Sequence, residues 1–337
     1  MLALLAAALA VSEGDFVVRD FHFRSGERLP ELRLHYRTLG TPGAPAVLVL
    51  HGTTGSGTQF LGESFAGALF GPGQLLDATK HFIILPDGIG HGGSSKPSDS
   101  LRARFPHYGY GDMVEAQRRL LVEKLGVSHL RLIVGTSMGC MHSWLWAEAW
   151  PRFMDAVLAL ACLPVQIAGR NRMLRKLAAD AIRQDPAWNG GDYQQQPLAG
   201  LRGALEVLFF MSSAAVPLQS QAVSRDAADR LAEEWMAKRL PATDANDFLY
   251  AFEASRDYDP SSGLEKVEAA VTAINSADDE VNPPELGILE REIRRVRRGK
   301  AIVLPVGPQT RGHGTHTNAL AWKDHLAELL ARSAPRP

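Results

Sequence analysis

The sequence predicts an α/β fold with a mostly parallel β-sheet, helices on both faces of the sheet and a helical insertion. Short continuous runs of valine, isoleucine and leucine recur along the chain, as is typical of strands that are buried on both faces. Amphipathic stretches with helical spacing separate these runs. One long polar stretch without any strand pattern interrupts the alternation.

The N-terminus is the apolar run MLALLAAALAV at residues 1–11, which ends in small residues and has no basic residue before it. We interpret residues 1–14 as a truncated signal segment, because secretory signals join an apolar stretch to a small-residue cleavage site. This interpretation predicts a periplasmic or secreted protein. The alternative is a short N-terminal segment of a cytoplasmic protein. The run is too short to cross a bilayer, so we predict no membrane span.

The strands and helices of the core are expected in the following order. Alternating residues around a Ser-Gly turn predict a β-hairpin, formed by residues 15–23 and 32–36. Buried apolar runs predict strands at 46–50 (AVLVL), 82–85 (FIIL), 130–134 (LRLIV), 156–162, 269–274 and 301–306. Helical spacing predicts helices at 113–125, 140–149 and 319–331, the last of which would cover the sheet edge.

A helical insertion is expected at residues 164–259, which are polar, rich in Arg, Gln and Asp, and free of any strand signal. Because this stretch stands between two predicted strands, we expect it to lie over the carboxyl edge of the sheet. The core would then consist of residues 15–163 and 260–337.

Charge and cysteine content exclude several classes of protein. The 337 residues include 36 Lys and Arg and 37 Asp and Glu, so the net charge of -1 provides no footprint for nucleic acid. The two cysteines, Cys140 and Cys162, cannot make a disulfide framework or a four-ligand zinc site. We interpret them as two small buried side chains, with a single bridge between them as the alternative.

A nucleophile motif, GTSMG at residues 135–139, lies between the predicted strand 130–134 and the predicted helix 140–149. This is the context that the Gly-x-Ser-x-Gly elbow of the α/β-hydrolase fold requires. Glycines flank the serine because side chains there would strike the neighbouring strand and helix. We therefore predict that Ser137 is the nucleophile and that the chain has the α/β-hydrolase fold.

An acid and a base should follow the serine in that order, because the serine hydroxyl needs a base and the base needs an orienting acid. The segment DEVNP at residues 279–283 follows a late strand in an Asp-x-Val-x-Pro pattern. It predicts Asp279 as the acid, with Asp278 as the alternative. His313, in a Gly-rich loop after the last strand, is the predicted base.

An oxyanion hole needs two backbone N–H groups to receive the charge that acyl transfer builds on a carbonyl oxygen. One donor is expected from Met138, the residue after the nucleophile. The other is expected from the loop HGTTG at residues 51–55, which follows an early strand. Thr53 is the predicted donor there, and Thr54 is the alternative.

Other interpretations are weaker. The segment 52–58 (GTTGSGT) lacks the lysine of a phosphate-binding loop. The segment 88–93 (GIGHGG) has the spacing of a dinucleotide motif, but no helix opens after it, so a Rossmann-type oxidoreductase is a remote alternative. A non-catalytic binding module of the same fold is another. His313 and His316 lack a third ligand, so we predict no metal, and we predict no cofactor.

The chain resembles the homoserine acetyltransferase family of α/β-hydrolases from about Asp15 onward. The resemblance rests on the loop, the elbow and landmarks beyond them: residues 51–55, 135–139, Trp146-Ala147, Trp150-Pro151, Asp185-Pro186-x-Trp188, Gly190-Gly191-x-Tyr193 and Gly200-Leu201. It implies a helical lid, an acyl-enzyme on Ser137 and a homodimer.

Two departures from that family bear on function. The family has Asp after the base, facing the homoserine amine, where this chain has Gly314. The family also has a lid arginine for the substrate carboxylate, where this chain has Leu205; Arg202 is nearby but on another helix face. We therefore predict hydrolysis of small-molecule acyl esters through an acyl-enzyme. The alternative is O-acyl transfer of the homoserine O-acetyltransferase type, with acetyl-CoA.

Overall fold

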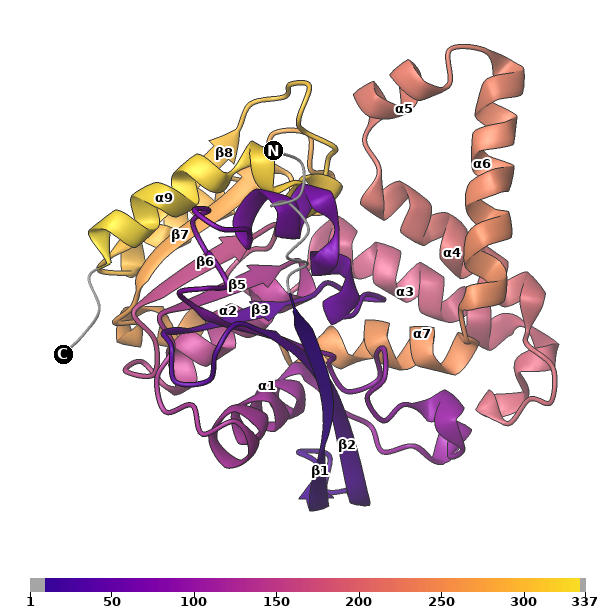
Figure 1. Cartoon of the computed structure of the whole chain (residues 1–337). Coiled ribbons are helices and arrows are strands. Elements are labelled where there is room, and N and C mark those ends of the chain that lie inside the picture. Colours follow the sequence, from indigo (N-terminus) through magenta and orange to yellow (C-terminus); the bar gives the residue numbers. More distant parts are fainter. Residues whose placement is uncertain (1–9, 334–337) are drawn as a thin grey trace.

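The computed structural model of the protein describes residues 10–333, which form a central sheet with helices on both faces (Figure 1). Eight strands follow one another across the sheet in the order β1-β2-β4-β3-β5-β6-β7-β8. β2 is antiparallel to β1 and to β4, and the other neighbouring pairs are parallel. The strands are β1 (Val11–His22), β2 (Arg28–Leu39), β3 (Ala46–Leu50), β4 (Phe82–Pro86), β5 (Leu132–Thr136), β6 (Ala156–Leu160), β7 (Ala270–Ser276) and β8 (Gly299–Leu304). The predicted fold class is confirmed.

Helices make up most of the rest of the described chain. They are α1 (Tyr110–Arg119), α2 (Met138–Ala149), α3 (Gly169–Gln184), α4 (Leu198–Ser212), α5 (Ala215–Gln221), α6 (Arg225–Arg239), α7 (Ala245–Glu253), α8 (Ile288–Glu292) and α9 (Lys323–Arg332). Helices α3 to α7 fall within the expected insertion, between β6 and β7, and Figure 1 shows them together at one side of the sheet.

The sheet is buried on both faces, which explains the continuous apolar runs. In β3, Leu48 and Leu50 belong to the cluster that contains Trp144 of α2. The alternate residues Val47 and Val49 belong to the cluster that contains Leu326 of α9. Because successive side chains of a strand point to opposite faces, a strand covered on both sides needs apolar residues at every position.

Several elements differ from the expectation. β1 begins at Val11, so residues 11–14 belong to the sheet; residues 1–9 of the expected signal segment lie outside the described residues. The helix expected at 113–125 begins at Tyr110 and continues beyond α1 as a π-helical turn (Leu120–Lys124). Helix α9 packs against β6 and β7 rather than covering the sheet edge, because its apolar side chains enter the core.

The interpretation of the cysteines as unlinked side chains is wrong. Cys140 and Cys162 form a disulfide, and their Cα atoms are 5.9 Å apart. Cys140 lies in the first turn of α2, and Cys162 lies just beyond β6. Because β6 is paired with β5, the strand that leads into α2, the two cysteines meet behind the nucleophile segment.

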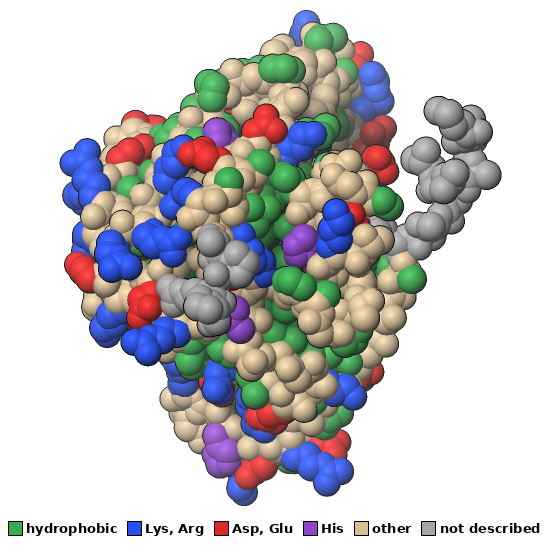
Figure 2. All heavy atoms as spheres, turned by 60° about the vertical axis from the view of Figure 1, so that its left-hand side comes forward, with side chains coloured by type: hydrophobic (Ala, Val, Ile, Leu, Met, Phe, Trp, Pro, Cys, Tyr) green, Lys and Arg blue, Asp and Glu red, His purple; other side chains and the backbone are tan. Residues whose placement is uncertain are grey.

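Membrane and surface features can be judged for residues 10–333. No single helix there has the length and apolar composition to cross a membrane, although α4 and α5, bent by 103°, pass that test as a pair. Figure 2 shows basic, acidic and hydrophobic side chains intermixed over one face of the molecule.

Candidate active site

The nucleophile segment forms a sharp turn between β5 and α2. Ser137 has a φ of 52° and a ψ of -109°, a region that side chains rarely adopt. A Cβ on Gly135 would lie 2.2 Å from the Gly139 carbonyl oxygen, and one on Gly139 would lie 2.1 Å from the Leu50 carbonyl oxygen. Only glycine therefore fits at these two positions, and the serine stands at the tip of the turn.

Three predicted side chains meet in one hydrogen-bonded chain. The Ser137 Oγ atom lies 2.8 Å from His313 Nε2, and His313 Nδ1 lies 3.0 Å from Asp279 Oδ2. A carboxylate can only accept, so Nδ1 carries the ring proton and Nε2 is left to accept from the Ser137 hydroxyl. The imidazole is therefore held in the tautomer that can remove the serine proton.

Asp279 is buried and remains charged. Burial raises the pKa of this carboxyl. The His313 charge and the hydrogen bonds from His313, Val281 and Asn282 lower the pKa by more than burial raises it, so the pKa lies below its ordinary value of 3.8. Asp279 Oδ1 accepts from the backbone N–H groups of Val281 and Asn282, at 2.8 and 3.2 Å. The backbone of the Asp-x-Val-x-Pro turn thus fixes the carboxylate and leaves Oδ2 for the histidine.

Asp278 has different partners from Asp279. Its Oδ2 atom accepts from the Gly312 backbone N–H at 2.9 Å, and its Oδ1 atom accepts from the Ser276 hydroxyl. Gly312 directly precedes His313, so Asp278 holds the loop that carries the histidine rather than the histidine ring. The two acids that the sequence left as alternatives therefore act on neighbouring parts of one loop.

The expected oxyanion donors lie on both sides of the serine. Within residues 10–333, neither the Met138 nor the Thr53 backbone N–H has a hydrogen-bond partner, whereas the Gly139 N–H donates to the His51 carbonyl at 3.0 Å. The loop of Thr53 comes close to the nucleophile, since a Cβ on Gly52 would lie 3.3 Å from Ser137 Cβ. Among the described residues the Thr54 N–H has no partner either, so Thr54 stays the alternative donor.

His316 lies beside the catalytic loop. Its ring centre is 5.3 Å from that of His313, and the two rings are nearly perpendicular. Burial and the nearby His313 charge lower the pKa of His316 to about 3, so this imidazole is neutral near pH 7. Within residues 10–333, no cluster of three or more His, Cys, Asp or Glu side chains has the geometry to hold a metal ion.

Three buried histidines, one of which begins the loop of residues 51–55, were given no role in the sequence analysis. The His51 Nδ1–H donates to the Gly52 carbonyl at 2.8 Å, and His51 Nε2 accepts from the Gly88 N–H at 2.9 Å. The His51 ring is near that of His91, with ring centres 5.1 Å apart, and His142 is also buried. Burial lowers the pKa of all three, for His91 to about 3. In the sequence, the burial of His51 and His142 is signalled only by their positions, directly after β3 and within α2.

Acid is expected to destabilise the fold through these histidines. Each folded pKa lies below the ordinary value of 6.5, so the unfolded chain binds protons that the native state does not bind as the pH falls below 6.5. Each group can remove up to about 1.4 kcal/mol of stability per pH unit, down to its folded pKa. Urea unfolding at pH 7.5 and 5.5 measures the loss.

His142→Gln and His22→Gln separate this effect from other titrations. His142 is buried, whereas the side chain of His22 is 66% exposed. We expect the pH dependence of the unfolding free energy to weaken in His142→Gln and to match the parent protein in His22→Gln. Equal slopes in all three proteins would show that the buried histidines do not control acid stability.

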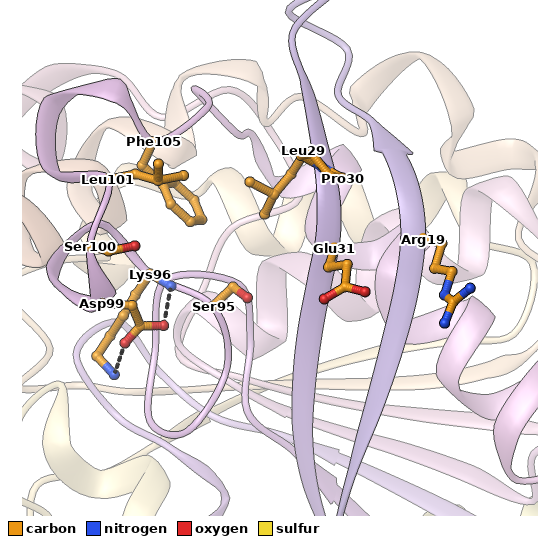
Figure 3. A pocket seen from close by; sticks show the side chains of 10 residues that line it. All are labelled: Arg19, Leu29, Pro30, Glu31, Ser95, Lys96, Asp99, Ser100, Leu101 and Phe105. Carbon is orange, nitrogen blue, oxygen red and sulfur yellow. Dashed lines mark hydrogen bonds and ion pairs between the residues drawn. The ribbon is translucent and has the colours of Figure 1, made fainter.

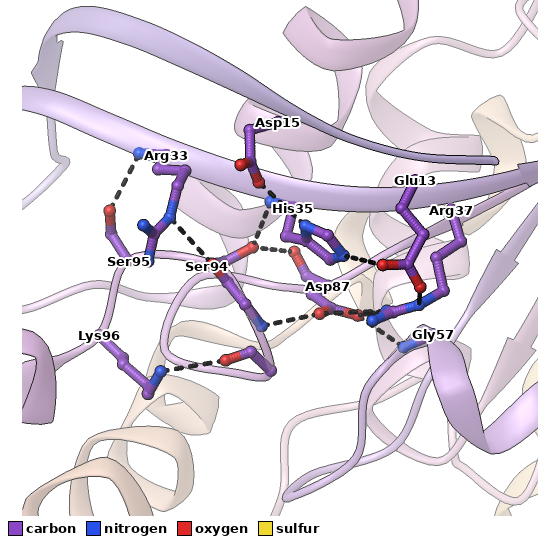
Figure 4. A network of polar contacts seen from close by, with 12 residues as sticks. Glu13, Asp15, Arg33, His35, Arg37, Gly57, Asp87, Ser94, Ser95 and Lys96 are labelled. Atoms are coloured by element: carbon purple, nitrogen blue, oxygen red, sulfur yellow. Dashed lines mark hydrogen bonds and ion pairs between the residues drawn. The ribbon is translucent and has the colours of Figure 1, made fainter.

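The glycine-rich segment 88–93 donates a backbone hydrogen bond to a carboxylate of the protein itself, that of Asp87. Figure 4 shows Asp87, which accepts from the Gly57 and Gly93 N–H groups at 2.7 and 2.9 Å and contacts Arg37 Nη1 at 3.2 Å. This network ties the segment to β2 and to the loop after β3, and no α-helix opens after it. Together with the hydrolase strand order, it overturns the dinucleotide alternative.

Two cavities in the described part of the chain are lined by no residue of the triad. The cavity in Figure 3, about 690 Å³, lies between the β1–β2 hairpin and the segment 95–105, and no triad residue lines it. A second cavity of about 290 Å³ is lined by Thr54 and His91 from the core and by Asp247 and Phe248 from α7. The second cavity thus joins the candidate oxyanion loop to the helical insertion.

The two positions at which this sequence departs from the acetyltransferase pattern, Leu205 and Gly314, both lie at the helical insertion or next to it. Leu205 is 1% exposed and packs in the apolar cluster of the insertion, whereas Arg202 is exposed. A Cβ on Gly314 would approach the Ser212 carbonyl oxygen to 3.4 Å, so a side chain there would lie between the catalytic loop and α4. Arg202 therefore does not occupy the buried position that Leu205 fills.

Comparison with sequence families gives a match over most of the core. The profile of the alpha/beta hydrolase fold family matches residues 45–291. A homoserine O-acetyltransferase of Natronomonas pharaonis is 30% identical over 299 residues, which cover 76% of this chain and 74% of that protein.

Solved structures share the fold. The homoserine O-acetyltransferase from Bacillus anthracis superposes with a TM-score of 0.82 at 20% identity, covering 97% of this chain and 99% of that chain. The acetyl esterase MekB superposes with a TM-score of 0.84 at 23% identity, covering 95% of this chain and 97% of that chain. At these identities the similarity concerns the fold alone.

Proposed function

Because this chain belongs to the homoserine acetyltransferase-like family of the α/β-hydrolase fold, we propose that it hydrolyses small acyl esters through an acyl-enzyme on Ser137. The main support is the hydrogen-bonded chain from Ser137 through His313 to Asp279. That the protein is an enzyme of acyl transfer or ester hydrolysis follows from the family itself. The choice of acceptor is the proposal.

Acylation begins when His313 Nε2 takes the Ser137 proton and Oγ attacks the ester carbonyl carbon. The carbonyl oxygen becomes negative and accepts hydrogen bonds from the Thr53 and Met138 N–H groups. Buried, ionised Asp279 stabilises the imidazolium that forms. His313 then gives its proton to the alcohol oxygen, the bond to that oxygen breaks, and the acyl group remains on Ser137.

Deacylation repeats these steps with water. His313 removes a proton from the water, whose oxygen attacks the acyl carbon, and the bond to Ser137 Oγ breaks as His313 returns the proton to it. Water is the proposed acceptor because Gly314 and Leu205 replace two charged groups that the family uses for an amino-acid alcohol. A site without those partners binds the charges of homoserine poorly.

O-Acetyl transfer to homoserine is the second candidate. The name of the Natronomonas pharaonis relative favours it more directly than hydrolysis. In that reaction the homoserine hydroxyl, rather than water, would attack the same acyl-enzyme. Ser137, His313 and Asp279 would keep the same roles, so only the acceptor distinguishes the two candidates.

The acceptor is tested by product analysis. With a 4-nitrophenyl ester and no homoserine, we expect turnover to the free acid at a rate that added homoserine does not change. With acetyl-CoA and homoserine, we expect little O-acetylhomoserine. Efficient O-acetylhomoserine formation that saturates at modest homoserine concentration would contradict hydrolysis and establish the second candidate.

Export and dimer formation complete the proposal. Disulfides such as Cys140–Cys162 persist mainly in oxidising compartments, which together with the apolar N-terminal run supports export. An unprocessed cytosolic protein with free thiols, found by fractionation of the natural host, would refute export.

Exposed apolar side chains on the insertion, such as Met173 and Phe210, support a homodimer, which light scattering tests.

A further inference from the structure

Asn282 lies in the turn that carries Asp279, and its side chain makes contacts beyond that turn. The residue is 4% exposed, and its backbone carbonyl accepts a hydrogen bond from the Asn275 side chain of β7 at 3.3 Å. Its own Nδ2 atom lies 3.1 Å from the Ala161 carbonyl oxygen and 3.4 Å from Asp279 Oδ2. Because an amide nitrogen carries two hydrogens, it can donate to both oxygens at once.

The orientation of this amide follows from its partners, which are both acceptors. A flipped amide would place Asn282 Oδ1 against two other oxygens. The backbone N–H of Asn282 also donates to Asp279 Oδ1, at 3.2 Å. One residue therefore donates to both oxygens of the Asp279 carboxylate. Its backbone holds Oδ1, and its side chain approaches Oδ2, the oxygen that accepts from His313.

Ala161, the other partner of the amide, has a strained backbone. Its φ of 64° lies in the left-handed region that residues with a side chain rarely adopt. Such a conformation persists only where neighbouring contacts hold it. The Ala161 N–H donates to the Ile274 carbonyl of β7 at 2.9 Å, and the Ala161 carbonyl accepts from Asn282. Both backbone polar groups of Ala161 are thus bonded to the strand and turn that carry the acid.

The residues on either side of Ala161 contact the nucleophile turn. The Leu160 carbonyl accepts from the Ser137 N–H at 2.8 Å. Cys162 is joined by the disulfide to Cys140, which lies in the first turn of the helix that follows Ser137. Residues 160–162 therefore connect the nucleophile turn with the acid turn, and the Asn282 amide bonds to the middle of this connection.

We propose that Asn282 is a positioning residue for the triad: its side-chain amide holds the Asp279 carboxylate toward His313 and joins it to the backbone bend beside Ser137. A carboxylate held at both oxygens keeps one orientation, and His313 can act as a base only while its orienting acid is aligned. The inference rests on the proposed acyl chemistry at Ser137. It applies to water and to homoserine as acceptor, because both would use the same triad.

The rate at which a fluorophosphonate labels Ser137 tests this role, because labelling needs an activated serine but no acceptor. Asn282→Asp keeps the shape of the side chain and loses the donor. Asn282→Leu loses the donor without adding a charge, and Asn282→Gln keeps the donor on a longer side chain. We expect labelling to slow by roughly tenfold or more in the first two variants and by less in Asn282→Gln, as loss of a hydrogen bond to a charged group predicts.

A role in packing alone predicts the reverse order. The isosteric Asn282→Asp would then be closest to the parent protein, and the larger Asn282→Gln would be labelled most slowly. That order, or equal rates in all four proteins, would overturn the positioning role. Urea unfolding gives the folded fraction to which each rate is normalised. If the buried charge of Asn282→Asp prevents folding, the comparison of Asn282→Leu with Asn282→Gln decides the question.

A double-mutant cycle shows whether Asn282 acts through Asp279. In Asp279→Asn the carboxylate that Asn282 holds is already lost, so adding Asn282→Leu should slow labelling further by less than about threefold. A loss of about tenfold in both backgrounds would show that Asn282 acts independently of the acid, which would contradict the proposal.

Asn246→Leu is the matched control. Asn246 is 1% exposed on α7, and its Nδ2 atom donates to the Gly191 carbonyl at 2.8 Å, so it is also a buried amide bonded to a backbone carbonyl. Its substitution should destabilise the fold and leave the labelling rate of the folded protein within about twofold of the parent rate. Slowing equal to that of Asn282→Leu would show that loss of any buried amide impairs Ser137, and the proposal would fail.

The same probe separates this role from the proposed function. If the parent protein is not labelled at all, the acyl chemistry at Ser137 is refuted. If the parent protein and Asn282→Leu are labelled equally fast, only the positioning role is refuted. Slow labelling of Asn282→Leu, in a protein whose parent forms O-acetylhomoserine efficiently, would support the positioning role and refute hydrolysis.

Discussion

Ser137→Ala is expected to lose ester turnover by about 10⁴-fold or more, because no other group replaces the attacking Oγ atom. A fluorophosphonate probe should label the parent protein and leave Ser137→Ala unlabelled. His313→Ala should lose turnover by a similar factor, because serine and histidine act as a unit. Their hydrogen bond of 2.8 Å is the structural reason for this expectation.

Ser143→Ala is the matched control for the nucleophile. Ser143 is buried on α2, six positions after Ser137, and its hydroxyl donates to the Cys140 carbonyl at 2.6 Å, away from the triad. It should keep labelling and turnover close to those of the parent protein. Labelling that survives in Ser137→Ala would assign the nucleophile to another residue.

Asp279→Asn is expected to lower turnover by roughly 10³- to 10⁴-fold. The amide would present either an N–H or a neutral oxygen to His313 Nδ1, so it would neither hold the reactive tautomer nor stabilise the imidazolium. The 3.0 Å contact between His313 Nδ1 and Asp279 Oδ2 is the interaction that changes. Steady-state kinetics on one ester measures the loss.

Asp278→Asn tests the same turn one residue earlier. In the parent protein the Asp278 carboxylate accepts a hydrogen bond from the Gly312 N–H at 2.9 Å, and the amide oxygen of asparagine can still accept that bond. We expect a loss below about tenfold, since the contacts that weaken, with Gly312 and Ser276, do not involve the histidine ring. A crippled Asp278→Asn together with an active Asp279→Asn would reverse the assignment of the two acids.

The strands, their parallel arrangement and the nucleophile turn could be predicted from the sequence because their signals are local. AVLVL predicts a buried strand wherever it lies in the sheet, and GTSMG between a strand and a helix predicts a turn that excludes side chains at two positions. The order of serine, acid and histidine narrowed the acid to two neighbouring residues. It did so because the carboxyl ends of parallel strands meet at one edge of a sheet.

The choice between Asp278 and Asp279 required the tertiary structure. Adjacent side chains point in different directions, and the backbone of the turn decides which carboxylate faces His313, 34 residues away. The same is true of the disulfide. The sequence predicts Cys140 and Cys162 only as small buried side chains. Their pairing depends on how β6 aligns with β5.

Local residue patterns are enough to predict a parallel sheet with a serine at its carboxyl edge, because strand burial and the elbow depend on residues within a few positions of each other. The burial of Arg175, and of His51, His91 and His142, could not be predicted in this way and depends on how distant elements pack. Helical periodicity places Arg175 on α3 but does not reveal that Ser255, 80 positions later in the chain, accepts a hydrogen bond from it. Burial and charge depend on such long-range neighbours, because the packing of distant elements sets how much water and which counterions each group meets.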